Sequence, residues 1–220
     1  MKYSTILWDM DGVLMDSEQQ HWRAWERTFR ELFGIDRIDW EVYKYTIGVR
    51  YEVVAALYER EYGVDVRPKE VQDRYDYHKA AVEEEEGYLV TPHLPEVLAE
   101  LQKRGYRMAV ASSSPLSDIE RFAEKTGLSP YFELLFSGDH VKHSKPAPDT
   151  FLKAAECLQS RPECCVVIED SYFGVKAAKA ANMACIGFRN PGSGDQDLTL
   201  SDAVVDDLRE VIRILDQGSI

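Results

Sequence analysis

A short apolar segment that ends in two closely spaced aspartates is the feature that most constrains this chain. Ile6-Leu7-Trp8 predicts a buried β-strand, and Asp9-Met10-Asp11-Gly12 follows it directly. In an open parallel sheet, ligands bind at the carboxyl ends of the strands, so both carboxylates are expected where chemistry takes place. Two carboxylates placed together repel each other unless a cation or a shared proton offsets their charge. The pair therefore indicates a functional site rather than a structural turn.

A calcium-binding loop is one alternative explanation of Asp9 and Asp11. Such a loop continues with oxygen ligands at alternate positions and ends in a glutamate. In this sequence the apolar segment Val13-Leu14-Met15 follows the two aspartates instead. The spacing therefore excludes a calcium loop at this position.

The carboxyl-terminal part of the chain alternates between apolar strands and amphipathic helices. With the first strand at 6–8, further strands are expected at 107–112, 131–136, 164–168 and 183–188. Helices are expected at 94–104, 116–126, 149–159, 173–181 and 206–215. Strands that alternate with helices favour a parallel sheet with right-handed crossovers.

Between the first strand and residue 90, the sequence predicts only helices. They are expected at 18–33, 40–45, 52–62 and 69–84, with Ser17 as the cap of the first helix and Gly34 at its end. We predict that residues 17–89 form an inserted helical cap domain and that residues 1–16 and 90–220 form the catalytic core. The predicted fold class is α/β, with a Rossmann-like parallel sheet core and an inserted α-helical cap.

Polar residues occur at or near the ends of several predicted strands, and a lysine lies in a proline-containing loop between two of them. These residues are Asp9, Asp11, Ser112, Lys145, Glu169 and Asp170. Because the carboxyl ends of parallel strands meet at one edge of the sheet, we expect the side chains to converge. Crowded oxygen ligands suit Mg²⁺, and a lysine with a hydroxyl suits the oxygens of a phosphoryl group. Such a site fits phosphoryl transfer to a carboxylate nucleophile.

The ordered set Asp9-x-Asp11-Gly12, Ser112, Lys145-Pro146 and Glu169-Asp170-Ser171 resembles the four motifs of the haloacid dehalogenase-like hydrolase superfamily. The resemblance covers essentially the whole chain, and it is greatest to the β-phosphoglucomutase-like and sugar-phosphate phosphatase members with a small helical cap. It implies a Mg²⁺-dependent enzyme that acts on a small phosphorylated metabolite, a sugar phosphate, through an aspartyl-phosphate.

The resemblance also implies a role for each matching residue. Asp9 is expected to be the nucleophile, and Asp11 the general acid and base whose main-chain carbonyl also binds the metal. Ser112 is expected to hold a phosphoryl oxygen, and Lys145 to neutralise charge beside Asp9. The expected metal ligands are Asp9, Asp11, Glu169 and Asp170. The expected substrate-binding residues are His21, Arg50, Lys79, Ser113 and Ser114.

The group that accepts the phosphoryl from Asp9 is left open between water and a sugar hydroxyl. His21 stands where β-phosphoglucomutases also carry a histidine, which favours a sugar phosphate. Pro115 stands where the mutases carry a lysine that helps to hold a second phosphate. We therefore predict a phosphatase, with a β-phosphoglucomutase-type hexose phosphate mutase as the alternative.

Three other classes of protein are weighed against this prediction. A true haloacid dehalogenase would lack the second aspartate, which Asp11 supplies. A phosphonate hydrolase would need a Schiff-base lysine in the cap, where Lys44 and Lys79 are available but lie in no convincing context. A catalytically weak sugar-phosphate-binding protein would be expected to have lost Asp9, Asp11 or Lys145, and all three are present.

Composition narrows the partners and the compartment. The net charge of −13 argues against a nucleic acid partner. The sequence has no run of membrane-spanning length and no basic amino-terminal segment followed by an apolar one. Four cysteines without metal-binding spacing predict reduced thiols. We therefore expect a monomeric cytoplasmic protein. His93, where the family usually shows glycine, leaves the geometry of the hinge open.

Overall fold

A six-stranded parallel sheet lies at the centre of the computed structural model, which describes residues 2–49, 51–218 and 220. The strands are β1 (Thr5–Trp8), β2 (Arg107–Ser112), β3 (Leu134–Ser137), β4 (Cys165–Glu169), β5 (Ala184–Phe188) and β6 (Ala203–Val205). Their order is β3-β2-β1-β4-β5-β6, and every adjacent pair is parallel. The strand order reverses between β1 and β4, which is where open α/β sheets bind ligands.

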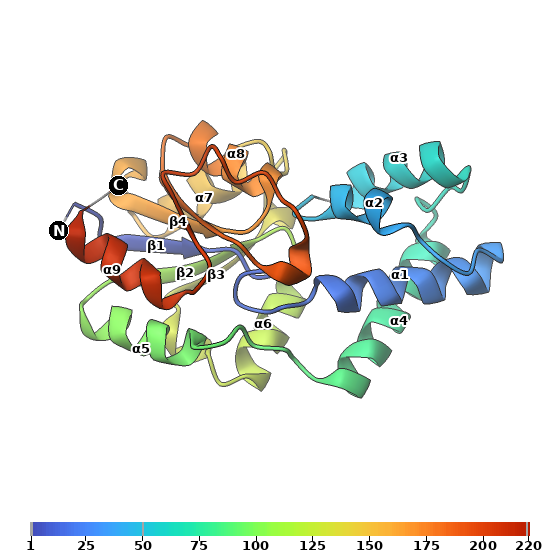
Figure 1. Cartoon of the computed structure of the whole chain (residues 1–220), viewed down its shortest axis with the longest axis horizontal. Coiled ribbons are helices and arrows are strands. Elements are labelled where there is room, and N and C mark those ends of the chain that lie inside the picture. The colour runs from blue at the N-terminus through green and yellow to red at the C-terminus, as the bar shows by residue number, and fades with distance from the viewer. Residues whose placement is uncertain (1, 50, 219) are drawn as a thin grey trace.

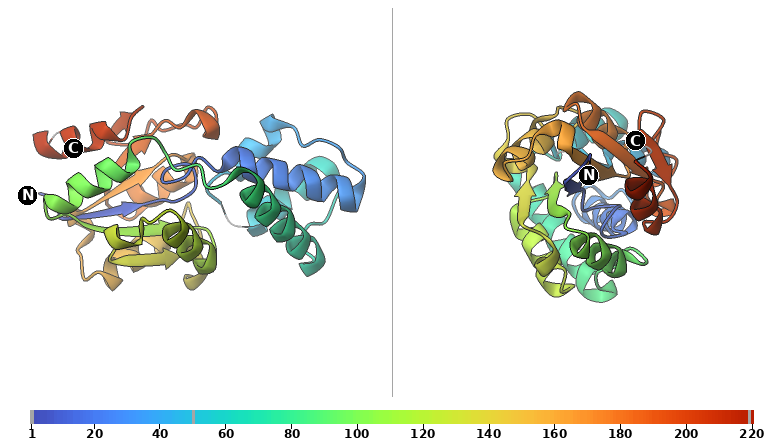
Figure 2. Two further views of the ribbon diagram at one scale, coloured as in Figure 1. Left: turned by 90° about the horizontal axis from the view of Figure 1, so that it is seen from below. Right: turned by 90° about the vertical axis from the view of Figure 1, so that its left-hand side faces the viewer.

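The helices form two groups along the molecule. The structure contains α1 (Glu18–Phe33), α2 (Trp40–Tyr43), α3 (Tyr51–Tyr62), α4 (Lys69–Glu86), α5 (Leu94–Lys103), α6 (Leu116–Lys125), α7 (Asp149–Cys157), α8 (Tyr172–Ala180) and α9 (Arg209–Gln217). Helices α1 to α4 gather at one end, and the sheet with the other helices lies at the opposite end, together with both chain termini (Figures 1 and 2). In the described residues, no helix is both long and apolar enough to cross a membrane.

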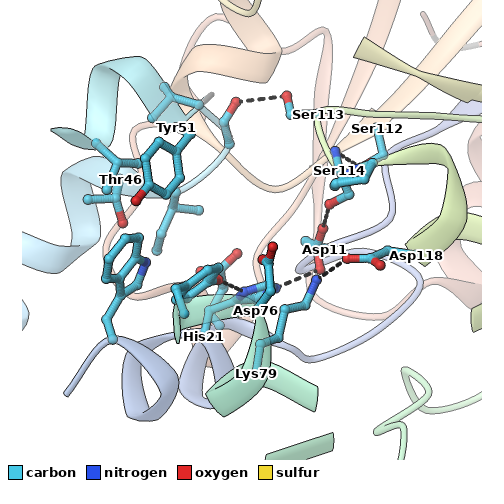
Figure 3. A pocket seen from close by; sticks show the side chains of 18 of the residues that line it. Asp11, His21, Thr46, Tyr51, Asp76, Lys79, Ser112, Ser113, Ser114 and Asp118 are labelled. Atoms are coloured by element: carbon cyan, nitrogen blue, oxygen red, sulfur yellow. Dashed lines mark hydrogen bonds and ion pairs between the residues drawn. The ribbon is translucent and has the colours of Figure 1, made fainter. Parts of the chain in front are cut away.

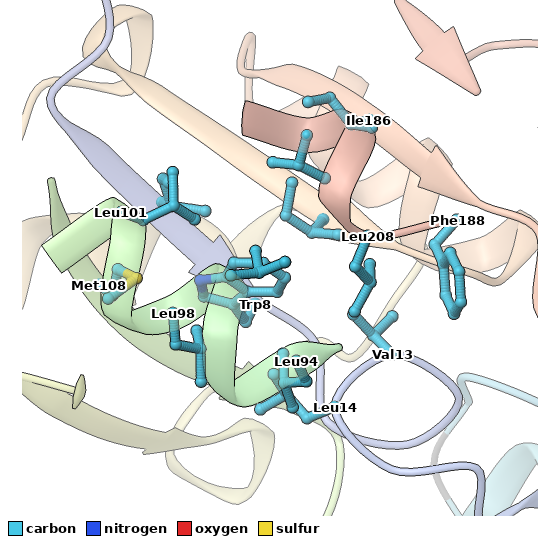
Figure 4. Close-up of a cluster of buried hydrophobic side chains, with 14 of the residues drawn as sticks. Trp8, Val13, Leu14, Leu94, Leu98, Leu101, Met108, Ile186, Phe188 and Leu208 are labelled. Atoms are coloured by element: carbon cyan, nitrogen blue, oxygen red, sulfur yellow. The ribbon is translucent and has the colours of Figure 1, made fainter. Parts of the chain in front are cut away.

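Alternate residues of the buried strands face two hydrophobic clusters, one on each side of the sheet. Trp8 packs with Leu98 of α5 and with Leu208, which precedes α9, in the first cluster (Figure 4). Its neighbour Leu7 packs with Phe151 of α7 in the second. Because side chains alternate across a strand, β1 is buried on both faces, as a central strand covered by helices must be.

A third hydrophobic cluster lies within α1 to α4 and includes no residue of the sheet. Trp25 and Phe29 of α1 meet Tyr58 of α3 edge to face, with ring centroids 5.2 and 4.9 Å apart. These aromatic contacts give the helices between β1 and α5 an apolar core of their own.

The predicted α/β fold class with a parallel, Rossmann-like sheet is confirmed, and the differences are one missed strand and shifted element ends. The predictions missed β6, which has only three residues and lies at the edge of the sheet. Strand β3 begins at Leu134, not at residue 131, because Ser129–Tyr131 forms a 3₁₀ turn. The last helix begins at Arg209, not at 206, since the Asp207 side chain accepts the Arg209 N–H.

Helices α1 to α4 are called the helical block below, and two residues at its ends adopt unexpected local structure. Ser17 precedes α1 as predicted, but its side chain makes no helix-capping hydrogen bond. Its hydroxyl donates to Asp11 instead, at 2.7 Å. His93 precedes α5 with a φ of 64°, a left-handed conformation that is unusual for a residue with a Cβ atom. Both positions lie where the chain passes between the helical block and the sheet.

Candidate active site

Three carboxylates and one lysine meet at the carboxyl ends of β1 and β4. Trp8 and Ile168 are register partners in these neighbouring strands, so the residues that follow them, Asp9 and Glu169, lie side by side. Lys145 donates to Asp9 Oδ1 and to Glu169 Oε1, each at 2.7 Å, and its side chain is fully buried. The structure thus brings together Asp9 and Glu169 from neighbouring strand ends and Lys145 from the loop before α7, and the sequence predicted that these three side chains converge.

Burial of three carboxylates beside one lysine costs free energy unless further positive charge is bound, and burial shifts the pKa values of the cluster. It raises the pKa of Asp9 to about 8, although the neighbouring Lys145 acts in the opposite direction. Burial and the negative charge of Glu169 also raise the pKa of Asp170 well above its usual range. For Lys145, burial alone would lower the pKa, but the carboxylates of Asp9 and Glu169 raise it. One ammonium group therefore compensates the three carboxylates only in part.

The donor set at this position fits a hard divalent cation. Oxygens of Asp9, Glu169 and Asp170 lie within 4.8 Å of one another. Asp170 Oδ1 is buried and has no hydrogen-bond partner among the described residues, whereas Oδ2 accepts a hydrogen bond from Ser193 at 2.5 Å. A buried carboxylate oxygen with no donor is unfavourable unless a cation binds it. Oxygen-only ligands of this kind suit Mg²⁺.

Close contacts fix Asp170 and Glu169 in place. A Cβ atom on Gly12, whose φ is 77°, would lie 1.9 Å from Asp170 Oδ2, so only glycine leaves room for the carboxylate. Both Glu169 oxygens have donors, since Lys145 binds Oε1 while the N–H and hydroxyl of Ser171 bind Oε2. Glu169 is thus held rigidly beside Asp9 and Lys145.

The Asp11 carboxylate points away from this cluster and toward the helical block. Ser17 and His21 bond its Oδ1 at 2.7 and 3.1 Å, and Ser114 donates to its Oδ2 at 2.5 Å. The other ring nitrogen of His21 lies 2.6 Å from the Tyr75 hydroxyl, so the ring can accept from Tyr75 and donate to Asp11. Burial would raise the Asp11 pKa, but His21, the charge of Lys79 and the Ser114 hydrogen bond hold it well below its usual range.

The loop that follows β2 supplies hydroxyl and N–H groups opposite Asp11. Ser112 is buried, and its hydroxyl accepts the Ser114 N–H at 3.0 Å, which leaves the hydroxyl proton to donate elsewhere. The Ser113 hydroxyl reaches the carbonyl of Gly48 in the helical block at 3.4 Å. Through Ser114 and Ser113, the loop thus contacts both Asp11 and the helical block (Figure 3).

A cavity of about 510 Å³ lies between the sheet and the helical block. The predicted site residues that line it are Asp9, Asp11, His21, Lys79, Ser112, Ser113 and Ser114. Lys145, Glu169 and Asp170 are buried and are not among its lining residues. Arg50 lies outside the described residues. Lys44 pairs with Glu41 and does not line the cavity, so it is not placed to react with a ligand there.

Lys79 is nearly buried and lies at the junction of α4 and α6. Its Nζ donates to Asp118 Oδ2 at 2.6 Å, and Glu83 lies 3.8 Å away. Arg121 of α6 also approaches Asp118 and Glu83, at 2.9 and 3.4 Å. The helical block is thus joined to the sheet region by an ion-pair network beside the cavity.

Sequence reasoning missed several polar residues that touch the predicted ones. Ser193 donates to Asp170, and the Asn190 side chain donates to the Gly12 carbonyl at 2.9 Å. Both follow β5, so the strand-end argument could have identified them. Asp118 lies within helix α6 and gives no comparable signal in the sequence, since only packing brings it to Lys79.

Comparisons with known proteins agree with this architecture. A model of the haloacid dehalogenase-like hydrolase family matches residues 3–182. Fructose-1-phosphate phosphatase YqaB of Escherichia coli is 32% identical over 197 residues, which cover 86% of this chain and 97% of YqaB. A CbbY variant from Rhodobacter sphaeroides, solved with xylulose-(1,5)bisphosphate, has a TM-score of 0.83 at 28% identity, covering 94% of this chain and 96% of CbbY. The β-phosphoglucomutase of Clostridium difficile also has a TM-score of 0.83, over 99% of this chain and 96% of the mutase, and at 22% identity it shows a common fold.

Proposed function

This chain belongs to the haloacid dehalogenase-like hydrolase family, and on that basis we propose that it is a Mg²⁺-dependent phosphatase acting on a small sugar phosphate through an aspartyl-phosphate. The observation that carries the proposal is the buried Asp9–Lys145–Glu169 cluster beside the unpartnered oxygen of Asp170. Asp9 is the member of this cluster that also lines the cavity. A substrate in the cavity can therefore reach a carboxylate whose orientation is fixed.

In the first step, an Asp9 carboxylate oxygen attacks phosphorus as the bond from phosphorus to the sugar oxygen breaks. Lys145 holds Asp9 Oδ1, so the other oxygen is the one that attacks. The Ser112 hydroxyl and the Ser113 N–H bind phosphoryl oxygens and orient the group for in-line attack. Asp9 and Asp170, with the Asp11 carbonyl, would hold Mg²⁺ while Glu169 orients Lys145. When bound, the ion neutralises charge on the phosphoryl oxygens.

Asp11 transfers protons in both steps. It gives a proton to the departing sugar oxygen, and it then takes one from the water that attacks phosphorus and releases phosphate from Asp9. The low pKa of Asp11 in the free protein keeps the carboxylate ionised, which is the state from which the second step starts. The first step requires protonated Asp11. The negative charge of a bound phosphate monoester raises the pKa of Asp11 and so favours the protonated form. Ser17, His21 and Ser114 position the carboxylate for both transfers.

We propose that residues 17–89 act as a cap that controls the access of water and substrate. The cap helices have their own hydrophobic cluster, and they supply His21, Tyr75 and Lys79 to the cavity. A cap that moves as a unit can admit a substrate and then exclude bulk solvent. The connections that would bend are the segments before α1 and before α5.

The test is a panel of phosphorylated sugars, with fructose 1-phosphate among them, assayed for phosphate release in Mg²⁺ and in excess chelator. We expect release only with Mg²⁺, none with Asp9→Asn, and a rate lower by about two to four orders of magnitude with Asp11→Asn. Asp36→Asn, an exposed carboxylate paired with Arg30, is the control and should be fully active. Full activity in chelator or with Asp9→Asn would refute the mechanism.

The same panel separates the phosphatase from the mutase alternative. Each reaction is also analysed for isomerised sugar phosphate. Conversion of β-glucose 1-phosphate without phosphate release, stimulated by a bisphosphate, would show that a sugar hydroxyl is the acceptor. Phosphate release without isomerisation is the expected result.

A further inference from the structure

Most of the charged residues that line the cavity beyond Asp9 and Ser112 are carboxylates. Helices α1, α3, α4 and α6 contribute four of them, Glu18, Glu52, Asp76 and Asp118. Among the lining residues that the structure describes, Lys79 is the one lysine or arginine, and His21 is the one histidine. Arg50, which lies between the lining residues Val49 and Tyr51 in the sequence, is outside the described residues.

The charge of Lys79 is already compensated inside the protein. Its Nζ lies 2.6 Å from Asp118 Oδ2, and the Lys79 side chain is only 9% exposed. Figure 3 shows Lys79 directed at Asp118, with Asp76 and Asp11 on the same side of the cavity. An anionic ligand group here would have to displace a carboxylate from Lys79 and would lie close to the others. Like charges in a partly buried site repel strongly.

The remaining wall suits a neutral, hydroxyl-bearing group. Trp25 stacks on Tyr75 with ring centroids 4.2 Å apart and lies 5.6 Å from the ring of Tyr51. Aromatic side chains offer apolar surface to the C–H groups of a sugar, and carboxylates accept hydrogen bonds from its hydroxyls. Glu18 is nearly buried and already accepts one hydrogen bond, from the Tyr43 hydroxyl at 2.8 Å.

We infer that this part of the cavity selects monophosphates with a neutral, hydroxyl-rich leaving group, and that Asp118 and Asp76 are the residues that reject a second phosphate. The inference rests on the proposed function, because it places the reacting phosphate at Asp9. The names of the related proteins do not imply this selectivity, because the similar CbbY variant was solved with a bisphosphate. Asp118 acts by occupying Lys79, and Asp76 acts by its own charge at the cavity mouth.

The experiment compares fructose 1-phosphate with fructose 1,6-bisphosphate, which share the ester that would react and differ in the second phosphate. With free Mg²⁺ held constant, we expect kcat/KM to favour the monophosphate at least about tenfold. Asp118→Asn and Asp76→Asn should each lower this preference at least about threefold. The matched control is Asp73→Asn, which removes an exposed charge paired with Lys69 on the same helix and should leave the ratio unchanged.

Binding of both sugars to the Asp9→Asn chain, measured by calorimetry, tests the same preference in the ground state without turnover. Circular dichroism confirms that each variant is folded before its ratio is used. Equal use of both sugars by the unmodified chain would overturn the inference, as would a ratio that Asp118→Asn and Asp76→Asn leave unchanged. Equal shifts with Asp73→Asn would also overturn it, because net charge alone would then be the cause. By contrast, no phosphate release from any sugar phosphate would refute the proposed function itself.

Discussion

Two buried carboxylates, Asp11 and Glu18, show how neighbouring groups determine the pKa of a side chain in this protein. Asp11 and Glu18 both line the cavity, yet their pKa values move in opposite directions. Asp11 accepts hydrogen bonds on both oxygens, so its ionised form is favoured despite burial. Glu18 is surrounded by fewer donors, and burial raises its pKa to about 7 although His21 acts in the opposite direction. Hydrogen-bond donors and neighbouring charges, rather than depth, separate the pKa values of the two residues.

The raised pKa of Glu18 predicts a pH-dependent stability. An acid whose pKa rises from 4.5 in the unfolded chain to about 7 on folding stabilises the fold below pH 4.5, and that stabilisation is lost as the pH rises through 7. Relative to Glu18→Gln, the wild-type free energy of unfolding should therefore fall by an amount on the order of 2 kcal/mol between pH 5 and pH 8.

Urea denaturation of both proteins at a series of pH values, in chelator, checks this prediction. Glutamine keeps an acceptor for the Tyr43 hydroxyl, so the comparison isolates the charge. Two stability curves that run parallel from pH 5 to pH 8 would contradict it.

At the scale of elements, the turn from β4 into α8 shows how a helix start orients a strand-end residue. Ser171 precedes α8, and its hydroxyl accepts the Gly174 N–H at 3.0 Å while donating to Glu169. A Cβ atom on Gly174 would lie 1.6 Å from Glu169 Oε1. The helix can approach Glu169 this closely only because glycine stands at this position.

Gly174→Ala is expected to displace Glu169 and loosen its hold on Lys145. Alanine in a helix usually stabilises relative to glycine by up to about 1 kcal/mol. Here the clash should reverse the sign and destabilise the fold by about 1–3 kcal/mol. The unfolding temperature and the rate of phosphate release should both fall. A variant that is more stable than wild type and fully active would show that the site relaxes freely.

At the scale of the whole molecule, the proposed cation site and the third hydrophobic cluster lie in different parts of the structure. The carboxylates follow β1 and β4 between the two clusters that cover the sheet, whereas the third cluster holds α1 to α4 together. Polar contacts join the two parts, among them the Lys79–Asp118 pair. Relief of charge repulsion at the cation site should therefore stabilise the sheet region first.

Mg²⁺ is expected to raise the unfolding temperature by several degrees, by an amount that grows with the logarithm of its concentration. Hydrogen exchange should slow most at the carboxyl ends of β1 and β4. Asp170→Asn should abolish most of both effects, because it removes an unpartnered ligand oxygen. Identical unfolding temperatures in Mg²⁺ and in chelator would contradict a cation site.

Local patterns in the sequence were sufficient to predict the α/β fold and the residues at the strand ends. Apolar runs mark the strands, and parallel strands necessarily bring Asp9, Ser112 and Glu169 to one edge. The pairing of Lys79 with Asp118, the hydrogen bonds on Asp11 and the carboxylate lining of the cavity were decided only by tertiary structure. These contacts join residues from separate elements, and helix packing rather than any local pattern sets which side chains meet.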